Sequence, residues 1–92
     1  MIPEAAQAQA LAGLKYLAER KEAFERFLAL AGLSAEEVAA RAAEPELLAA
    51  ALDHLAEDEE LAAGFCEEAG LTPEGFAALR AAFPGGAQVH WT

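Results

Sequence analysis

Hydrophobic side chains recur along the chain at intervals of three and four residues, which is the spacing that collects them on one face of an α-helix. The inward positions that this spacing predicts are Ala10, Leu11, Leu14, Leu17 and Ala18, then Phe24, Phe27, Leu28 and Ala31, then Val38 and Ala42, then Leu47, Leu48, Ala51, Leu52 and Leu55, then Leu61, Ala62, Phe65 and Ala69, and last Phe76, Leu79 and Phe83. Alanine, the strongest helix former, fills much of the remainder, and β-branched residues are rare. The pattern therefore predicts an all-α fold, a small bundle of five or six short helices.

One connector between helices occurs twice, in residues 31–38 and 69–76. In each copy a glycine suits the left-handed residue that ends a helix, and a serine or threonine two residues later can cap the next helix. A glutamate completes a capping box in the first copy, and a proline takes the first helical position in the second. The connector residues are Gly32, Leu33, Ser34 and Glu37, and then Gly70, Leu71, Thr72 and Pro73.

The other helix boundaries follow from single residues. Pro3 opens the first helix, and Pro45 opens another because the residue before a proline avoids the helical region. Asp58 is a cap for the helix that follows it. We expect the helix that starts at Ser34 to continue to Glu44, and residues 84–86 to end the last helix. Residues 19–22 are polar on all sides, which leaves open whether the first helix breaks or bends there.

A shift of 38 residues aligns the two connectors and much of the hydrophobic pattern. The matched pairs are Leu14 with Leu52, Leu17 with Leu55, Phe27 with Phe65, Leu33 with Leu71, and Val38 with Phe76. Composition alone does not explain these matches. We therefore predict one domain in residues 1–86, built from two similar halves of about 38 residues. The halves are residues 4–44 and 45–84, packed on each other around a pseudo-twofold axis, and residues 87–92 form a short tail.

Charge is distributed unevenly along the chain. Residues 1–41 contain six acids and five Lys or Arg, a net charge of −1, whereas residues 42–92 contain ten acids and Arg80 alone, a net charge of −9. Within residues 44–68 there are nine acids and no cation. The residues Glu46, Asp53, Glu57 and Glu60 can share one outward helical stripe, although a break at Asp58 would turn Glu60 away. We interpret the stripe as a surface for a protein partner with a basic surface, against the alternative of a purely solubilising surface.

The same acidity argues against nucleic acid as a partner. Residues 32–40 resemble the first part of a helix-turn-helix unit, whose DNA recognition helix would begin near Pro45. That helix would repel phosphates, whose neutralisation supplies the affinity for DNA. The longest apolar run is too short to span a bilayer, and no secretory signal is visible at the start, so we expect a cytoplasmic protein without a membrane partner.

Residues that could carry chemistry are few. His54 and Asp58 lie one helical turn apart, as do Asp53 and Glu57, but a metal site needs further ligands and His90 is the only other histidine. Cys66, the single cysteine, stands beside two glutamates that oppose thiolate formation, and it matches Leu28 in the other half. We interpret it as a buried small hydrophobic residue. The sequence therefore predicts no catalytic residue, no metal and no cofactor.

Several short segments together resemble a bacterial family called domain of unknown function 3572. They are Arg26-Phe27-Leu28, Gly32-Leu33, Leu52-Asp53-His54-Leu55 and Gly70-Leu71-Thr72-Pro73-Glu74, and the resemblance covers roughly residues 10–84. The family usually has Asp-Pro where Arg20-Lys21 stand in this chain, so the first break between helices does not carry over. The resemblance implies a small cytoplasmic helical protein and supplies no catalytic residue.

Together these observations favour a non-enzymatic protein-interaction module or adaptor. The alternative is a small-molecule-binding protein or weak enzyme with a pocket between the two halves. A third possibility is a homo-oligomer whose surface serves assembly. A pocket that holds His54 or Cys66 with convergent polar groups would favour the second class, and an exposed acidic or apolar patch would favour the first.

Overall fold

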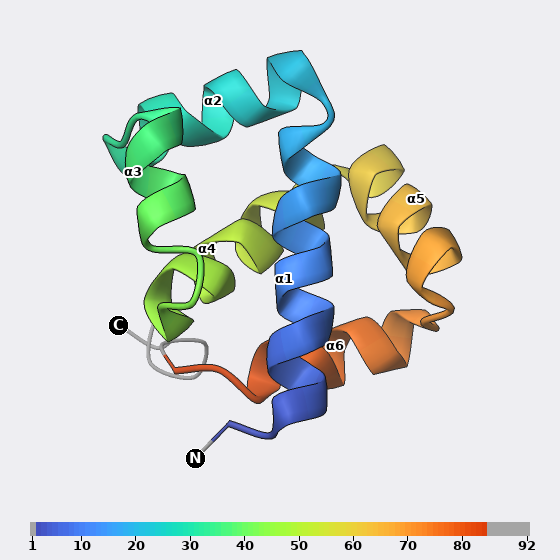
Figure 1. Ribbon diagram of the computed structural model, residues 1–92. Helices are drawn as coiled ribbons and strands as arrows, with labels where there is room; N and C mark the ends of the chain where they lie inside the picture. Colours follow the sequence, from blue (N-terminus) through green and yellow to red (C-terminus); the bar gives the residue numbers. More distant parts are fainter. Residues whose placement is uncertain (1, 85–92) are drawn as a thin grey trace, which may run out of the picture.

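Residues 2–84 form six α-helices in the computed structural model of the protein (Figure 1). They are α1 (Glu4–Ala18), α2 (Lys21–Ala31), α3 (Ala35–Ala40), α4 (Pro45–Ala56), α5 (Glu59–Ala69) and α6 (Pro73–Ala81). Helices make up 77% of this part of the chain, which contains no strand, so the all-α prediction is confirmed. Residue 1 and residues 85–92, with the predicted tail, lie outside the described residues.

Both copies of the connector end one helix and start the next where the sequence predicts. Gly32 and Gly70 are left-handed, with φ of +70° and +72°. In each copy the amide of the leucine that follows donates to a carbonyl of the last helical turn, at 3.1 Å in the first copy and 2.8 Å in the second. These bonds use carbonyls that a helix end would otherwise leave without a partner. The glycines are therefore required by the backbone.

The predicted caps are present at three helix starts. The hydroxyl of Ser34 accepts from the amide of Glu37 at 3.1 Å, and the carboxylate of Glu37 accepts from the amide of Ser34 at 2.9 Å, which completes the capping box. Thr72 accepts from the amide of Gly75 at 2.9 Å. The carboxylate of Asp58 accepts from two amides of α5, at 2.9 and 3.3 Å. Each cap satisfies amides that have no partner within their own helix.

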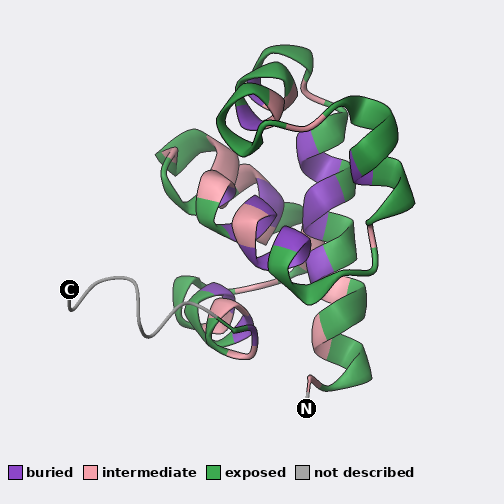
Figure 2. Cartoon of the chain, turned by 90° about the vertical axis from the view of Figure 1, so that its left-hand side faces the viewer, coloured by how far each residue is buried: buried purple, intermediate pink, exposed green. Residues whose placement is uncertain are grey.

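The helix α1 occupies the centre of the bundle (Figure 1). Its most extensive contact is with α4, and α2, α5 and α6 also pack against it. Gly13 permits the close approach, because a Cβ atom there would lie 3.3 Å from side chains of both α4 and α5. Buried residues line the inner faces of the helices (Figure 2), with Leu17, Leu52, Leu55 and Phe65 almost completely enclosed. None of the helices between residues 2 and 84 is long and apolar enough to cross a membrane.

The buried face of α1 differs from the prediction. Leu11, expected inside, is 41% exposed, and Ala18 is exposed, whereas Tyr16 is buried. The reason is that α5 covers the side of α1 where Tyr16 lies, with the Tyr16 and Phe65 ring centroids 5.9 Å apart. Leu11 instead faces the short helix α3 across an open hollow. Ala31, also expected inside, is exposed at the end of α2.

Two helix boundaries in the first half were not determined by the sequence pattern. The first helix breaks at Arg20, whose extended backbone has φ −109° and ψ 98° and separates α1 from α2. The expectation that the third helix reaches Glu44 is wrong, because α3 ends at Ala40. The backbone leaves the helical region at Arg41, and the amide of Glu44 donates to the Arg41 carbonyl at 2.9 Å. This turn redirects the chain so that Pro45 can begin α4 against α1.

The molecule is almost equally wide in all directions, with extents of 29 × 28 × 27 Å. Its radius of gyration of 12.2 Å matches the roughly 12 Å expected for one compact domain of this length. The bounds of α2 and α5 are related by the 38-residue shift, as are the starts of α3 and α6. The similarity of the two halves as three-dimensional units stays a prediction.

Candidate functional site

The predicted acidic stripe is divided between two helices. Glu46, Asp53 and Glu57 follow one another along α4 and its C-terminal end, and all three are exposed. Glu60 is also exposed but belongs to α5, because the chain breaks at the cap Asp58 between the two helices. The structure therefore brings three of the four stripe residues onto one helix and places the fourth after the turn. That turn, residues 57–60, is itself a run of four acids.

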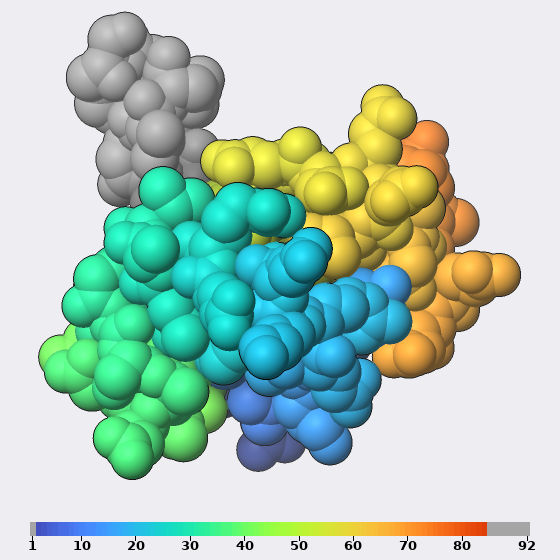
Figure 3. Space-filling view, turned by 90° about the horizontal axis from the view of Figure 1, so that it is seen from above, coloured from blue at the N-terminus to red at the C-terminus, as the bar shows by residue number. Residues whose placement is uncertain are grey.

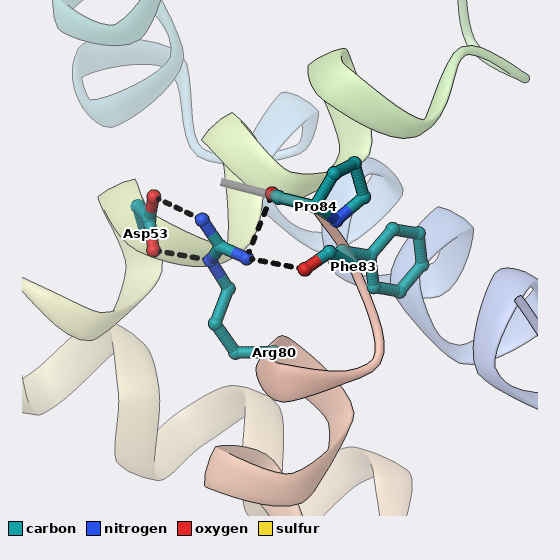
Figure 4. Close-up of polar contacts among 4 residues, drawn as sticks. All are labelled: Asp53, Arg80, Phe83 and Pro84. Atoms are coloured by element: carbon teal, nitrogen blue, oxygen red, sulfur yellow. Dashed lines mark hydrogen bonds and ion pairs between the residues drawn. The ribbon is translucent and has the colours of Figure 1, made fainter. Parts of the chain in front are cut away.

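Asp53 is held by Arg80, the only cation in residues 42–92 (Figure 4). The guanidinium donates to both carboxylate oxygens, at 2.6 Å from Nε and 3.0 Å from Nη2. Its remaining nitrogen, Nη1, donates to the carbonyls of Phe83 and Pro84 at 3.3 Å each. The Arg80 side chain is only 16% exposed, and it joins α4 to the end of α6. Asp53 therefore takes part in an ion pair that joins α4 to α6, and Arg80 balances its negative charge.

The remaining acids of residues 44–68 are exposed except Asp58, which is half-buried. Within residues 2–84, Asp53 and Glu44 are the acids of this segment with a Lys, Arg or His nitrogen within 4.0 Å, and the Glu44 contact to Arg41 is at that limit. A pair at such a distance in solvent contributes little. Most of the negative charge of residues 44–68 is therefore not paired with a cation of the described residues.

His54 is half-buried on α4 and packs edge-on against Phe27 of α2, with ring centroids 5.5 Å apart. It lines a small hollow of about 210 Å³ together with Asp53 and Glu57. Figure 3 looks onto this side of the molecule, with α2 in the centre and the α4–α5 junction beside it. Residues 2–84 contain no group of three His, Cys, Asp or Glu that could hold a metal ion. His90, the other candidate ligand, lies outside the described residues.

The sequence predicts a buried Cys66, whereas the structure leaves it half-buried. It lines an open hollow of about 490 Å³ between the end of α4, one face of α5 and the start of α6. The wall is apolar apart from one carboxylate: Ala56, Ala62, Cys66, Pro73 and Phe76 form it together with Glu59. Phe76 is buried as the helical spacing predicts, whereas Ala62 is only half-buried, and the spacing did not predict the hollow beside it. Helical spacing identifies an inward face but not how fully the neighbouring helices cover it.

A smaller hollow lies in the first half, between α1, α2 and α3. Its volume is about 300 Å³, and Leu11, Phe24, Val38 and Lys15 are among its lining residues. A bundle of six short helices leaves such openings where a helix of two turns cannot cover its neighbours. The described residues thus contain two open apolar hollows, one beside a lysine and one beside a glutamate.

These features define a small all-α protein with an acidic second half and apolar hollows between short helices. The chain belongs to the family described as Protein of unknown function (DUF3572), whose sequence model matches residues 3–86. The match confirms the family resemblance drawn from the sequence segments and covers nearly the whole chain. No curated protein and no solved structure matches the chain.

Proposed function

We propose that the protein is a non-enzymatic interaction module, or adaptor, whose second half binds a protein partner with a basic surface. The observation that carries this proposal is the exposed acidic turn between α4 and α5, in a half whose single cation is already bound to Asp53. Concentrated charge of one sign speeds the encounter with a partner of opposite sign. Solubility alone would be served equally well by acids spread over both halves.

The alternative, a small-molecule site between the halves, rests on the hollow at His54, because the hollow at Cys66 lies within the second half and has a single carboxylate in an otherwise apolar wall. The volume of the hollow at His54, about 210 Å³, lies below the roughly 300–1,000 Å³ of ordinary ligand sites. One of its polar groups, Asp53, is already bound by Arg80. These two observations make the interaction role the better supported of the two.

The test uses three forms of the protein as baits in a native lysate. One form is the parent, the second carries Glu46→Gln, Glu57→Gln and Glu60→Gln, and the third is a matched control with Glu22→Gln, Glu25→Gln and Glu36→Gln. All six glutamates are exposed, so the folds should be retained. Asp53 is left unchanged because it holds Arg80.

We expect at least one captured protein to be lost with the second-half variant and retained with the first-half control. Its association rate with the parent should fall as salt rises from low to physiological ionic strength, where exposed charges are screened over about 8 Å. Identical captures by all three baits, or an association rate insensitive to salt, would leave the acids as solubilising surface only.

A further inference from the structure

The hollow at Cys66 has a counterpart in the first half. Shifting four of its lining residues back by 38 positions gives four residues that line the hollow between α1, α2 and α3. The corresponding pairs are Ala56 with Ala18, Ala62 with Phe24, Pro73 with Ala35, and Phe76 with Val38. The same location in each half is therefore left open by the helices, and the two hollows can be compared residue by residue.

The comparison shows why the second hollow is larger. At one position the first half has the bulky Phe24, and the second half has Ala62. Phe24 is half-buried and lies nearly parallel to Phe27, with ring centroids 6.3 Å apart, so its ring is held in place. The hollow that contains Phe24 measures about 300 Å³, and the one with Ala62 measures about 490 Å³. The second volume falls in the range of sites that bind ligands.

The two hollows also differ in charge. Lys15 lines the first hollow, and the residue that corresponds to Glu59 of the second is Lys21. Around the second hollow, Glu59 lines the wall in the first turn of α5, and the exposed Glu74 follows Pro73 in the first turn of α6. An occupant of this hollow would therefore be apolar where it enters and positively charged at its edges.

We infer that this hollow docks an amphipathic basic helix of a partner protein, with a large apolar side chain inserted between Ala62 and Phe76 and Lys or Arg beside Glu59 and Glu74. Helices commonly bind other proteins by placing an apolar face into a groove of this kind. The inference rests on the proposed interaction role and adds where the partner binds and what it is like. A phosphate-bearing surface, of nucleic acid or of anionic lipid, does not fit because the rim is acidic.

The first experiment measures binding of a fluorescent peptide of about 18 residues, or five helical turns, with Leu and Lys at amphipathic spacing. Comparison peptides replace all Leu by Ser or all Lys by Glu. The variant Ala62→Phe places in the second half the side chain that the first half already has, and Ala12→Phe is the matched control on an exposed part of α1. Circular dichroism checks that both variants retain their helix content.

We expect the Leu/Lys peptide to bind the parent and Ala12→Phe alike, and both comparison peptides to bind much more weakly. Ala62→Phe should raise Kd at least about tenfold, because the contacts of one large apolar side chain are lost. Equal binding by Ala62→Phe and the parent, or no binding of the peptide to the parent, would overturn the docking site. Weak binding by the variant with Glu46, Glu57 and Glu60 replaced, together with unchanged binding by Ala62→Phe, would support the acidic surface as a binding surface. The same result would overturn the hollow as the docking site.

A second measurement needs no substitution, since Cys66 is the only cysteine and lines the hollow. Saturating Leu/Lys peptide should slow the reaction of Cys66 with a maleimide reagent severalfold, and the Ser/Lys peptide should not. An unchanged rate would place the peptide elsewhere and overturn the inference. A molecular mass in light scattering that rises with protein concentration, and ceases to do so in Ala62→Phe, would identify a second copy as the occupant and would also overturn it.

Discussion

At the scale of single residues, Tyr16 shows how one side chain organises the contact between two helices. Its ring is buried where α1 meets α5, 5.9 Å from the ring of Phe65, and the guanidinium of Arg20 lies over the tyrosine ring at 3.3 Å from the centroid. Arg20 also donates to the Tyr16 carbonyl at 2.8 Å, which fixes the break between α1 and α2. The hydroxyl of Tyr16 lies against Gly64 of α5, where a Cβ atom would overlap it.

The substitution Gly64→Ala should therefore destabilise the protein even though alanine favours helices. The gain in helix propensity is roughly 1 kcal/mol, whereas forcing extra atoms into a packed contact costs typically 1–3 kcal/mol. We expect a net loss of about 1 kcal/mol in chemical denaturation. The double variant with Tyr16→Phe removes the hydroxyl and should recover most of this loss. A single variant as stable as the parent would mean that α5 does not rest on Tyr16.

At the scale of helices, stop and start signals lie in the connectors and are satisfied locally. A Cβ atom at Gly70 would have no neighbour within 4 Å, so a side chain there meets no steric obstacle beyond its own backbone. The cost of a substitution at Gly70 thus comes from φ alone, which is +72°. This makes the connector a clean test of whether the helix ends where the sequence predicts.

Thr72→Ala should lower the free energy of unfolding by roughly 0.5–2 kcal/mol, the usual effect of a lost cap. Gly70→Val should cost more, because a β-branched residue in the left-handed region is a strained exception. Thermal melts of the two variants and the parent measure the difference. A Gly70→Val variant that melts no lower than the parent would contradict the left-handed helix end.

The bond between Arg80 and Asp53 joins elements that the connectors do not. It links α4 to α6 across 27 residues of sequence, through two hydrogen bonds on a mostly buried guanidinium. We expect Arg80→Met, which keeps much of the apolar stem, to cost about 1 kcal/mol, between an exposed pair and a bidentate buried one. Asp53→Asn should cost a similar amount, and the double variant should cost less than the two together. Simple additivity would show that the two residues act independently.

At the scale of the whole molecule, the core crosses the boundary between the predicted halves. The most extensive contact joins α1 of the first half to α4 of the second. Phe65 of the second half packs on Tyr16 of the first, and Phe27 of the first packs on His54 of the second, at 5.9 and 5.5 Å between ring centroids. The 38-residue shift exchanges these two pairs, as a pseudo-twofold arrangement would require.

Neither half should fold alone, because each supplies part of the other's core. We expect fragments 1–44 and 45–92 to have little helix separately and to regain the parent's circular dichroism when mixed. A first fragment with Leu17→Asp, altered at a completely buried position, should fail to restore it. Cooperative unfolding of either fragment by itself would contradict this interdependence.

The sequence alone determined the local features of the fold. Helix starts and ends at Ser34, Asp58, Gly70 and Pro73 were predictable because capping and the left-handed glycine depend on a few neighbouring residues. The inner leucines of α4 were predictable because that helix is covered broadly enough for spacing to identify its face. The family resemblance and the net charge of the second half were likewise contained in the sequence.

Tertiary structure decided which of several similar faces each helix would bury. Leu11 and Tyr16 both lie on α1, and only the position of α5 determines that Tyr16 is the buried one. The end of α3 at Ala40, the bond between Asp53 and Arg80 and the hollow beside Cys66 also depend on residues brought together from distant parts of the chain. The physical reason is that spacing along a helix specifies directions, whereas burial depends on which surfaces the other helices reach.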